Sequence, residues 1–269
     1  MKDTTIALAA QNSIPGESEY NLQACINLAE KASEAGASII VFPEMNLTGY
    51  CSGKALLEVA VPLSEKICSA LSETAKTNEI TIAAGLAHLE HNHKIYASHM
   101  VVFPDAGIQV YKKIHAAPPE RETLSTGEKI GIFQTKTLKF GIQLCYDAHF
   151  PELSTRMALE GADIIMIPHA SPRGSGQEKL DSWMRHLTAR AFDNSVFIAA
   201  VNQVGNNGRG LNFPGVSVII GPDGKILSKS ISNRENLLVA KLETACLESV
   251  RNHRMKYFLP NRREDLYFS

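Results

Sequence analysis

Two stretches of this chain are nearly alike: Gly36-Ala37-Ser38-Ile39-Ile40-Val41-Phe42-Pro43-Glu44 and Gly161-Ala162-Asp163-Ile164-Ile165-Met166-Ile167-Pro168-His169. Each begins with a glycine, a residue at which helices commonly end. Each continues as an unbroken apolar run, which is typical of a strand covered on both faces. Each then closes on a proline and a polar residue. We interpret the pair as equivalent positions in two copies of an α/β unit.

The sequence on either side of both stretches alternates between strand and helix patterns. Amphipathic helices are predicted where apolar residues recur every three to four positions, and strands where short apolar runs end at turn residues. In the first half the predicted strands are 5–10, 37–42 and 79–86, the helices 21–35 and 63–77, and a hairpin joins 95–103 to 108–112. In the second half the strands are 138–144, 162–168 and 196–202, the helices 152–160 and 177–193, and a hairpin joins 216–220 to 225–228.

This order predicts an α/β protein with a four-layer α-β-β-α sandwich. Two mixed β-sheets would pack face to face, and helices would cover the outer side of each sheet. No Pro/Ser-rich linker interrupts the chain, so residues 1–269 are expected to form a single domain. Residues 250–269 read as an extended, aromatic-bearing tail that needs a surface to pack against.

Composition narrows the possible functions. The 269 residues are 44% hydrophobic and carry 27 basic against 28 acidic side chains, so nothing favours binding to nucleic acid or to a membrane surface. No apolar run is long enough for a transmembrane helix, and the start of the chain lacks a signal-peptide pattern. The five cysteines are odd in number and form no CxxC pair, which disfavours disulfides and structural zinc. A cytoplasmic protein without metal or cofactor is expected.

Three residues that can carry chemistry follow predicted strands, the place where ligands bind in open α/β folds. They are Glu44, Lys113 and Cys145. A thiolate can attack an electrophilic carbon, a carboxylate can accept the thiol proton, and an ammonium can stabilise the negative charge that develops. Any one of these residues alone is weak evidence, but together they suggest a reaction centre. The other four cysteines are expected to be packing residues.

The segments around these residues resemble the signatures of the nitrilase, or carbon–nitrogen hydrolase, superfamily. Their order and spacing match that family, and the similarity extends over nearly the whole chain. The three signature segments are Phe42-Pro43-Glu44-Met45-Asn46-Leu47-Thr48-Gly49-Tyr50, Tyr111-Lys112-Lys113-Ile114-His115 and Leu144-Cys145-Tyr146-Asp147-Ala148-His149-Phe150-Pro151-Glu152. The resemblance implies a catalytic triad of Glu44 as general base and acid, Lys113 as electrostatic stabiliser and Cys145 as nucleophile.

The resemblance also implies a second glutamate and an oxyanion hole. Glu120 and Glu122 compete for the glutamate role, and we choose Glu120 because residues 120–127 are similar to the family form E-S-K-T-L-S-P-G, in which Thr126 stands here for proline. The oxyanion hole would combine the ammonium group of Lys113 with the backbone N–H of Tyr146.

The resemblance implies a hydrolase that cleaves a small linear amide or N-carbamoyl compound through a thioester on Cys145. The pair Tyr146-Asp147 is more similar to amidases than to true nitrilases, which typically have Cys-Trp-Glu. Nitrile hydrolysis is therefore the nearest alternative, followed by a non-catalytic or acyl-transferring member of the fold. The partners would be a small-molecule amide and water. Homodimers or larger homo-oligomers are expected, with the tail at the interface.

Substrate-binding candidates come from the strand ends in the second half of the chain. His169 occupies the position of Glu44 in the sequence echo, and Arg173, in the loop that follows, could pair with a substrate carboxylate. Asn202 ends the next predicted strand. His115 is expected to support the site or to contact substrate. Trp183 is expected in the core or at a subunit interface.

The run His88-Leu89-Glu90-His91-Asn92-His93 could suggest a metal site. No cysteine or aspartate completes a ligand set, so a solvated turn is the favoured interpretation.

Overall fold

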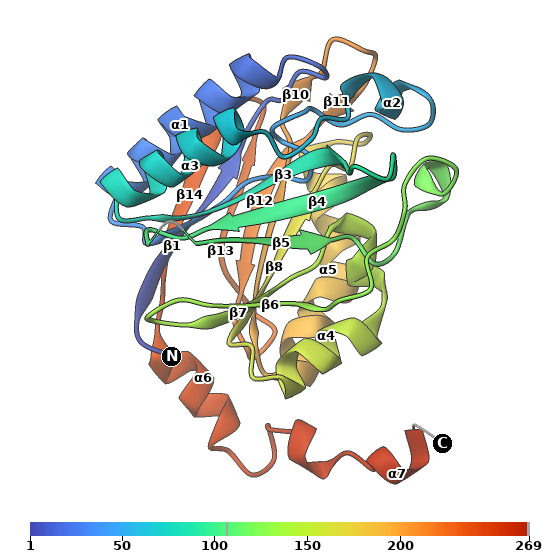
Figure 1. The fold of residues 1–269 in the computed structure, drawn as a ribbon. Helices are drawn as coiled ribbons and strands as arrows, with labels where there is room; N and C mark the ends of the chain where they lie inside the picture. The colour runs from blue at the N-terminus through green and yellow to red at the C-terminus, as the bar shows by residue number, and fades with distance from the viewer. Residues whose placement is uncertain (106, 268–269) are drawn as a thin grey trace.

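Two six-stranded sheets form the centre of the molecule in the computed structural model, which describes residues 1–105 and 107–267 (Figure 1). The first sheet has the order β14 (Asn236–Leu242), β1 (Thr4–Ala10), β2 (Ile39–Val41), β3 (Thr81–Leu89), β4 (Ile95–Val102), β5 (Ile108–Lys112). The second has the order β13 (Ile226–Ser232), β12 (Gly215–Ile220), β9 (Phe197–Asn202), β8 (Ile164–His169), β7 (Lys139–Ile142), β6 (Gly131–Gln134). A small ribbon of β10 (Gly205–Asn206) and β11 (Asn212–Phe213) stands apart from both.

Helices cover the outer face of each sheet and complete four layers. The pair α1 (Ser18–Glu34) and α3 (Glu65–Thr77) lies on the first sheet, and the pair α4 (Pro151–Leu159) and α5 (Gly176–Asn194) lies on the second. The remaining helices are short: α2 (Ala55–Val59), α6 (Thr244–Arg251), α7 (Glu264–Tyr267) and the 3-10 turns η1 (Pro118–Glu120), η2 (Cys145–His149) and η3 (Leu259–Asn261). The predicted α-β-β-α sandwich is confirmed.

The sequence echo corresponds to a structural repeat. β2 lies between β1 and β3 and is parallel to both, and β8 lies in the same way between β7 and β9. In each sheet the third strand of the parallel triplet then pairs antiparallel with a fourth, β3 with β4 and β9 with β12. The carboxyl ends of β2 and β8 therefore deliver Glu44 and His169 to equivalent places.

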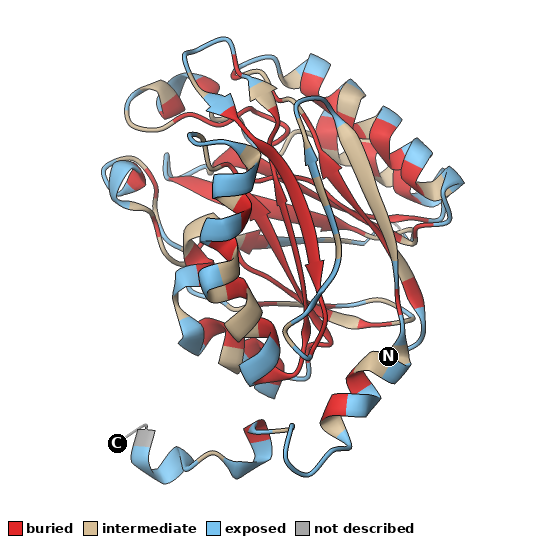
Figure 2. Ribbon diagram, turned by 180° about the vertical axis from the view of Figure 1, so that it is seen from behind, coloured by how far each residue is buried: buried red, intermediate tan, exposed pale blue. Residues whose placement is uncertain are grey.

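Alternating strand residues build three apolar clusters. In β8, Ile164 and Met166 face the first sheet, whereas Ile165 and Ile167 face α4 and α5. The central strands are buried on both faces, as Figure 2 shows by their red colour. This burial explains why their sequences are continuously apolar rather than alternating.

Several elements differ from the sequence-based expectations. The predicted bounds of most helices and strands shift by one to three residues, and the second strand shrinks from 37–42 to Ile39–Val41. The prediction omitted β6, β14, α2 and α6. β14 pairs antiparallel with β1 along its whole length, from Thr4 opposite Leu242 to Ala10 opposite Asn236. The two ends of the domain thus lie side by side in one sheet.

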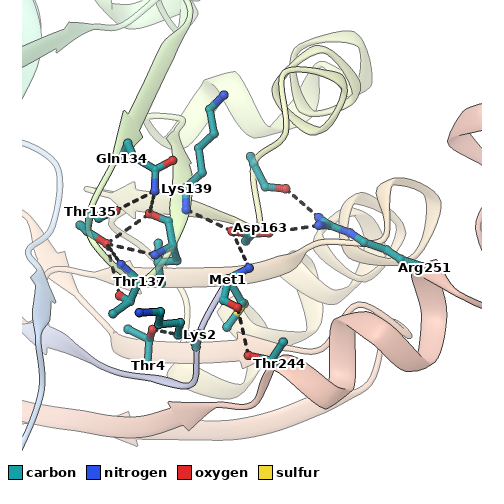
Figure 3. Close-up of polar contacts among 12 residues, drawn as sticks. Met1, Lys2, Thr4, Gln134, Thr135, Thr137, Lys139, Asp163, Thr244 and Arg251 are labelled. Carbon is teal, nitrogen blue, oxygen red and sulfur yellow. Dashed lines mark hydrogen bonds and ion pairs between the residues drawn. The ribbon is translucent and has the colours of Figure 1, made fainter.

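A polar cluster fixes α6 to the second sheet before the chain leaves the body (Figure 3). Arg251 donates from Nη1 to Asp163 Oδ1 at 3.1 Å and from Nη2 to the carbonyl of Ala162 at 2.8 Å. Beyond Arg251 the tail packs in part against the helices of the second sheet: Phe258 contacts Phe192 of α5 at 5.5 Å between ring centroids, and Leu259 is buried in the same apolar cluster. Met255 and Leu266 are 74% and 63% exposed. The expected role of residues 250–269 at a subunit interface stays a prediction; Phe268 and Ser269 lie outside the described residues.

None of the helices within residues 1–105 and 107–267 is both long and apolar enough to cross a bilayer.

Candidate active site

Glu44 follows β2 in a tight loop that is held from several sides. Asn46 accepts from the backbone N–H of Gly85 at 2.7 Å, and Gln203 donates to the carbonyl of Glu44 at 2.9 Å. Met45 has a left-handed φ of 55°, and a side chain at Gly85 would meet the Met45 nitrogen at 2.7 Å. Glycine at position 85 is therefore required for the loop to approach β3. The result is a fully buried Glu44 carboxylate in a fixed position.

Lys113 comes directly after β5 and lies between two carboxylates. Its Nζ donates to Glu44 Oε1 at 2.7 Å and to both carboxylate oxygens of Glu120, Oε2 at 2.9 Å and Oε1 at 3.2 Å. All three side chains are buried. An ammonium group has three protons, and one is left for a further acceptor when the two oxygens of Glu120 share a single proton. The second oxygen of Glu44, Oε2, is buried and has no hydrogen-bond partner within the described residues.

The structure separates the two competing glutamates. Glu120, at the end of η1, also accepts from the backbone N–H of Ala117 at 2.8 Å and from the hydroxyl of Tyr50 at 3.0 Å. Glu122 is exposed on the following turn and makes no contact with Lys113. Only Glu120 is thus gathered with Glu44 and Lys113.

Cys145 is the first residue of η2 and occupies a strained bend after β7. Its φ of 43° lies in the left-handed region, which is uncommon for a residue with a side chain and occurs often at functional sites. Tyr146 is the next residue at the start of η2, where N–H groups precede the first bonds within a helix. The bend therefore presents the thiol next to a backbone donor.

Asp147 holds the Cys145 bend in place. Its carboxylate is fully buried and accepts four hydrogen bonds: from the Tyr111 hydroxyl at 2.8 Å, the Leu144 N–H at 3.0 Å, the His115 N–H at 2.8 Å and the His115 Nδ1 at 2.9 Å. Because Tyr111 and His115 flank Lys113, Asp147 joins the lysine segment to the cysteine segment. His115 also stacks on Phe150, with ring centroids 3.7 Å apart, so its contacts are supporting ones.

Burial dominates the protonation states of Glu44 and Cys145. It raises the pKa of Glu44 to about 7, against the opposing effect of Lys113. Burial, followed by the Glu44 carboxylate, also raises the pKa of the Cys145 thiol to about 12, although the positive charge of Lys113 lowers it. Burial disfavours the Lys113 ammonium, but Glu44 and Glu120 outweigh it and raise the pKa of Lys113. The resting pair is therefore a neutral thiol and a carboxylate able to take its proton.

The three substrate-binding candidates lie in different surroundings. His169 is buried and stacks on Trp183 at 4.3 Å between centroids, and neither ring nitrogen has a partner within the described residues. Asn202 is committed to the loop after β8: it accepts from the Ser171 N–H and donates to the carbonyls of Ser171 and Pro214. Arg173 is exposed at a left-handed φ of 78°. Of the three, only His169 presents unpaired polar atoms in a buried position.

The histidine-rich run is only partly a solvated turn. His91 and His93 are exposed in the turn, but His88 is a buried residue of β3, so the prediction is wrong for His88. In the described parts of the chain, no group of three or more His, Cys, Asp or Glu side chains is arranged to hold a metal ion.

Comparison with known proteins identifies the family. Residues 5–252 match the model of the carbon–nitrogen hydrolase family. The chain is 30% identical to an (R)-stereoselective amidase of Pseudomonas sp. over 84% of this chain and 80% of the relative, and 29% identical to a nitrilase of Pyrococcus abyssi over 94% of both. It also superposes on an amidase of Nesterenkonia sp. AN1 with a TM-score of 0.84 and 25% identity, over 98% of this chain and 95% of that one. That structure is of a mutant of the Nesterenkonia amidase and shows covalent addition of the acetamide moiety of fluoroacetamide at the active-site cysteine.

The fold thus brings a buried Glu-Lys-Glu cluster close to a strained cysteine, which feels the charges of all three residues. The chain belongs to the carbon–nitrogen hydrolase family, within the nitrilase superfamily. Amidases are among the members that it resembles in both sequence and structure.

Sequence reasoning assigned no role to several residues that build the site. Tyr50 and Asp147 belong to the quoted motifs, and each contacts a proposed catalytic residue or its neighbour. The signal was available, because a buried tyrosine and aspartate need hydrogen-bond partners. Lys179 lies in none of the quoted motifs. Its one signal in the sequence is a spacing of four residues before Trp183, which places both on one face of α5, and Trp183 stacks on His169.

Proposed function

We propose that the protein is a thiol-dependent amidase that hydrolyses small linear amides, including ω-amides and N-carbamoyl compounds, through a thioester on Cys145. The observation that carries the proposal is the buried lysine between two glutamates, with Lys113 Nζ at 2.7 Å from Glu44 and 2.9 Å from Glu120. A surface role does not explain three buried charged groups, because charges removed from water need a compensating function or partner.

In the first half of the reaction, Glu44 acts as base. Its unpartnered Oε2 takes the Cys145 proton while the sulfur attacks the amide carbon. The third proton of Lys113 and the N–H of Tyr146 stabilise the oxyanion. The tetrahedral intermediate then collapses, Glu44 returns the proton to the leaving nitrogen, and ammonia departs.

In the second half, water replaces ammonia. Glu44 takes a proton from water as its oxygen attacks the thioester carbon, and the intermediate breaks the C–S bond to give the carboxylic acid. The proton held by Glu44 returns to Cys145 as the sulfur leaves. Glu120 keeps Lys113 in place through both steps. One amide and one water become one acid and one ammonia.

An ammonia-release panel tests the proposal. Wild-type protein should release ammonia from short amides, ω-amides or N-carbamoyl acids faster than from matched nitriles. Cys145→Ala should remain folded by circular dichroism and show no turnover, because no covalent step remains. Cys68→Ala, which removes a half-buried cysteine of α3, should keep full activity. Amide turnover retained in Cys145→Ala would refute the nucleophile, and preferred nitrile turnover would favour the alternative.

Assembly is part of the same proposal. Homodimerisation through residues 250–269 is supported by the exposure of Met255 and Leu266, two large apolar side chains on a tail that is otherwise anchored to α5 by Phe258 and Leu259.

A further inference from the structure

A half-buried lysine lies beside the loop that contacts the nucleophile. Lys179 is in the first turn of α5, and its Nζ donates to Ser171 Oγ at 2.6 Å and to the carbonyl of Pro172 at 3.3 Å. Ala170, the residue before Ser171, directs its backbone N–H at the Cys145 thiol and so favours the thiolate. The residue that Lys179 contacts, Ser171, therefore directly follows the residue whose backbone N–H contacts the Cys145 sulfur.

The charge of Lys179 is not neutralised by protein. No ion pair joins it to a carboxylate within residues 1–105 and 107–267. Burial lowers the pKa of Lys179, and the Cys145 side chain counteracts this effect when it is ionised. Two of the three ammonium protons are used, so one remains for a further acceptor. A cation that is partly desolvated and unpaired is suited to bind an anion.

The neighbouring side chains form an uncharged wall next to this cation. Trp183 lies one helical turn after Lys179 on the same face of α5 and stacks on His169. Burial and the surrounding positive charges lower the pKa of His169 well below its usual range, so its ring is neutral. Its two buried, unpartnered nitrogens offer one donor and one acceptor.

We propose that Lys179 is the specificity-determining residue for substrates that carry a carboxylate a short distance from the amide, such as the monoamides of dicarboxylic acids. The amide would lie at Cys145, the methylene chain against His169 and Trp183, and the carboxylate at Lys179. Arg173, the cation that the sequence suggested for this role, is exposed on the loop. The inference rests on the proposed amidase function and names its substrate class.

A matched substrate pair tests the proposal. Succinamate carries the carboxylate, and 4-methylpentanamide replaces it with an isopropyl group of similar shape. Loss of one charge-assisted hydrogen bond corresponds to about 10-fold to 150-fold in binding. The selectivity for succinamate, expressed as the ratio of the two kcat/KM values, should therefore fall by about 30-fold or more in Lys179→Met, mainly through KM. Lys179→Arg should restore part of it.

Controls separate the possible outcomes. Arg185→Met, on the exposed face of α5, should keep the wild-type ratio. An equal loss for both substrates in Lys179→Met would overturn the proposal, because Lys179 would then only support the Ser171 loop. A ratio that falls in Arg173→Met and not in Lys179→Met would also overturn it. Wild-type protein that cleaves 4-methylpentanamide as well as succinamate would refute this inference alone, whereas cleavage of no amide would refute the amidase function.

Discussion

Replacing Glu120 by glutamine tests how the two buried glutamates interact. Glu44 and Glu120 contact the same nitrogen of Lys113 at 2.7 and 2.9 Å, so their nearest carboxylate oxygens are within about 6 Å of each other. The negative charge of Glu120 is one of the causes that raise the pKa of Glu44, after burial. Glu120→Gln removes that charge and keeps the shape of the side chain.

The size of the effect follows from Coulomb's law. Two unit charges about 6 Å apart at an effective dielectric constant of about 20 repel by about 3 kcal/mol, which corresponds to about two pKa units. The pKa of Glu44 is about 7 in the wild-type protein. In Glu120→Gln it should drop by about two units. Glu44 must be ionised to act as base, so activity should rise with pH through the pKa of Glu44 in both proteins, and at lower pH in the variant.

The assay is the pH dependence of kcat/KM for a short amide. If turnover in Glu120→Gln is too slow, the rate of Cys145 alkylation by iodoacetamide reports the same base. Glu122→Gln is the matched control, because Glu122 is exposed nearby. Its replacement should leave unchanged the acidic limb of the profile, which is the range of pH over which kcat/KM rises. An acidic limb that stays at the wild-type pH in Glu120→Gln would show that the two glutamates are not coupled through Lys113.

Three further changes address the supports of the site. Tyr50→Phe removes the hydroxyl bound to Glu120, so stability should fall by about 1 kcal/mol in urea unfolding, with a lower kcat; unchanged values would contradict this. Asp147→Asn removes a buried carboxylate that accepts four hydrogen bonds, so the free energy of unfolding should fall by about 3 kcal/mol in the same assay. A smaller loss than in Tyr50→Phe would contradict this expectation. Burial lowers the pKa of His99 to about 3 from 6.5, so the unfolded state binds more protons between these values and stability falls as pH drops below 6.5. His99→Gln should flatten that loss, and an equally steep loss would refute the assignment.

The sequence was sufficient for the layer architecture because both sheets contain long apolar strands bounded by glycine or proline. The repeat of residues 36–44 at 161–169 was the strongest of these signals, and it corresponds to the central strands of two parallel triplets. β14 was not predicted because its partner β1 lies at the opposite end of the sequence, and the apolar run of residues 237–240 does not indicate the strand with which it pairs. Such long-range pairing leaves no local mark.

The site shows the same division between local and long-range information. Glu44, Lys113 and Cys145 were found because motifs with recognisable neighbours surround them, and the structure brings the first two into contact. Glu120 was chosen over Glu122 because residues 120–127 resemble the family form, whereas the contact itself depends on η1, which turns the Glu120 side chain toward Lys113. Lys179 was not found because only the packing of α5 against the Ser171 loop reveals its position.

The chemical claim at the centre of the proposal is the thioester on Cys145. Acid-quenching the protein during turnover of a short amide, followed by peptide mass spectrometry, measures it directly. The acyl group should appear on the Cys145 peptide, form and decay at rates compatible with kcat, and disappear on treatment with hydroxylamine. Ammonia release without any acyl group on Cys145, or an acyl group on one of the other four cysteines instead, would contradict the mechanism.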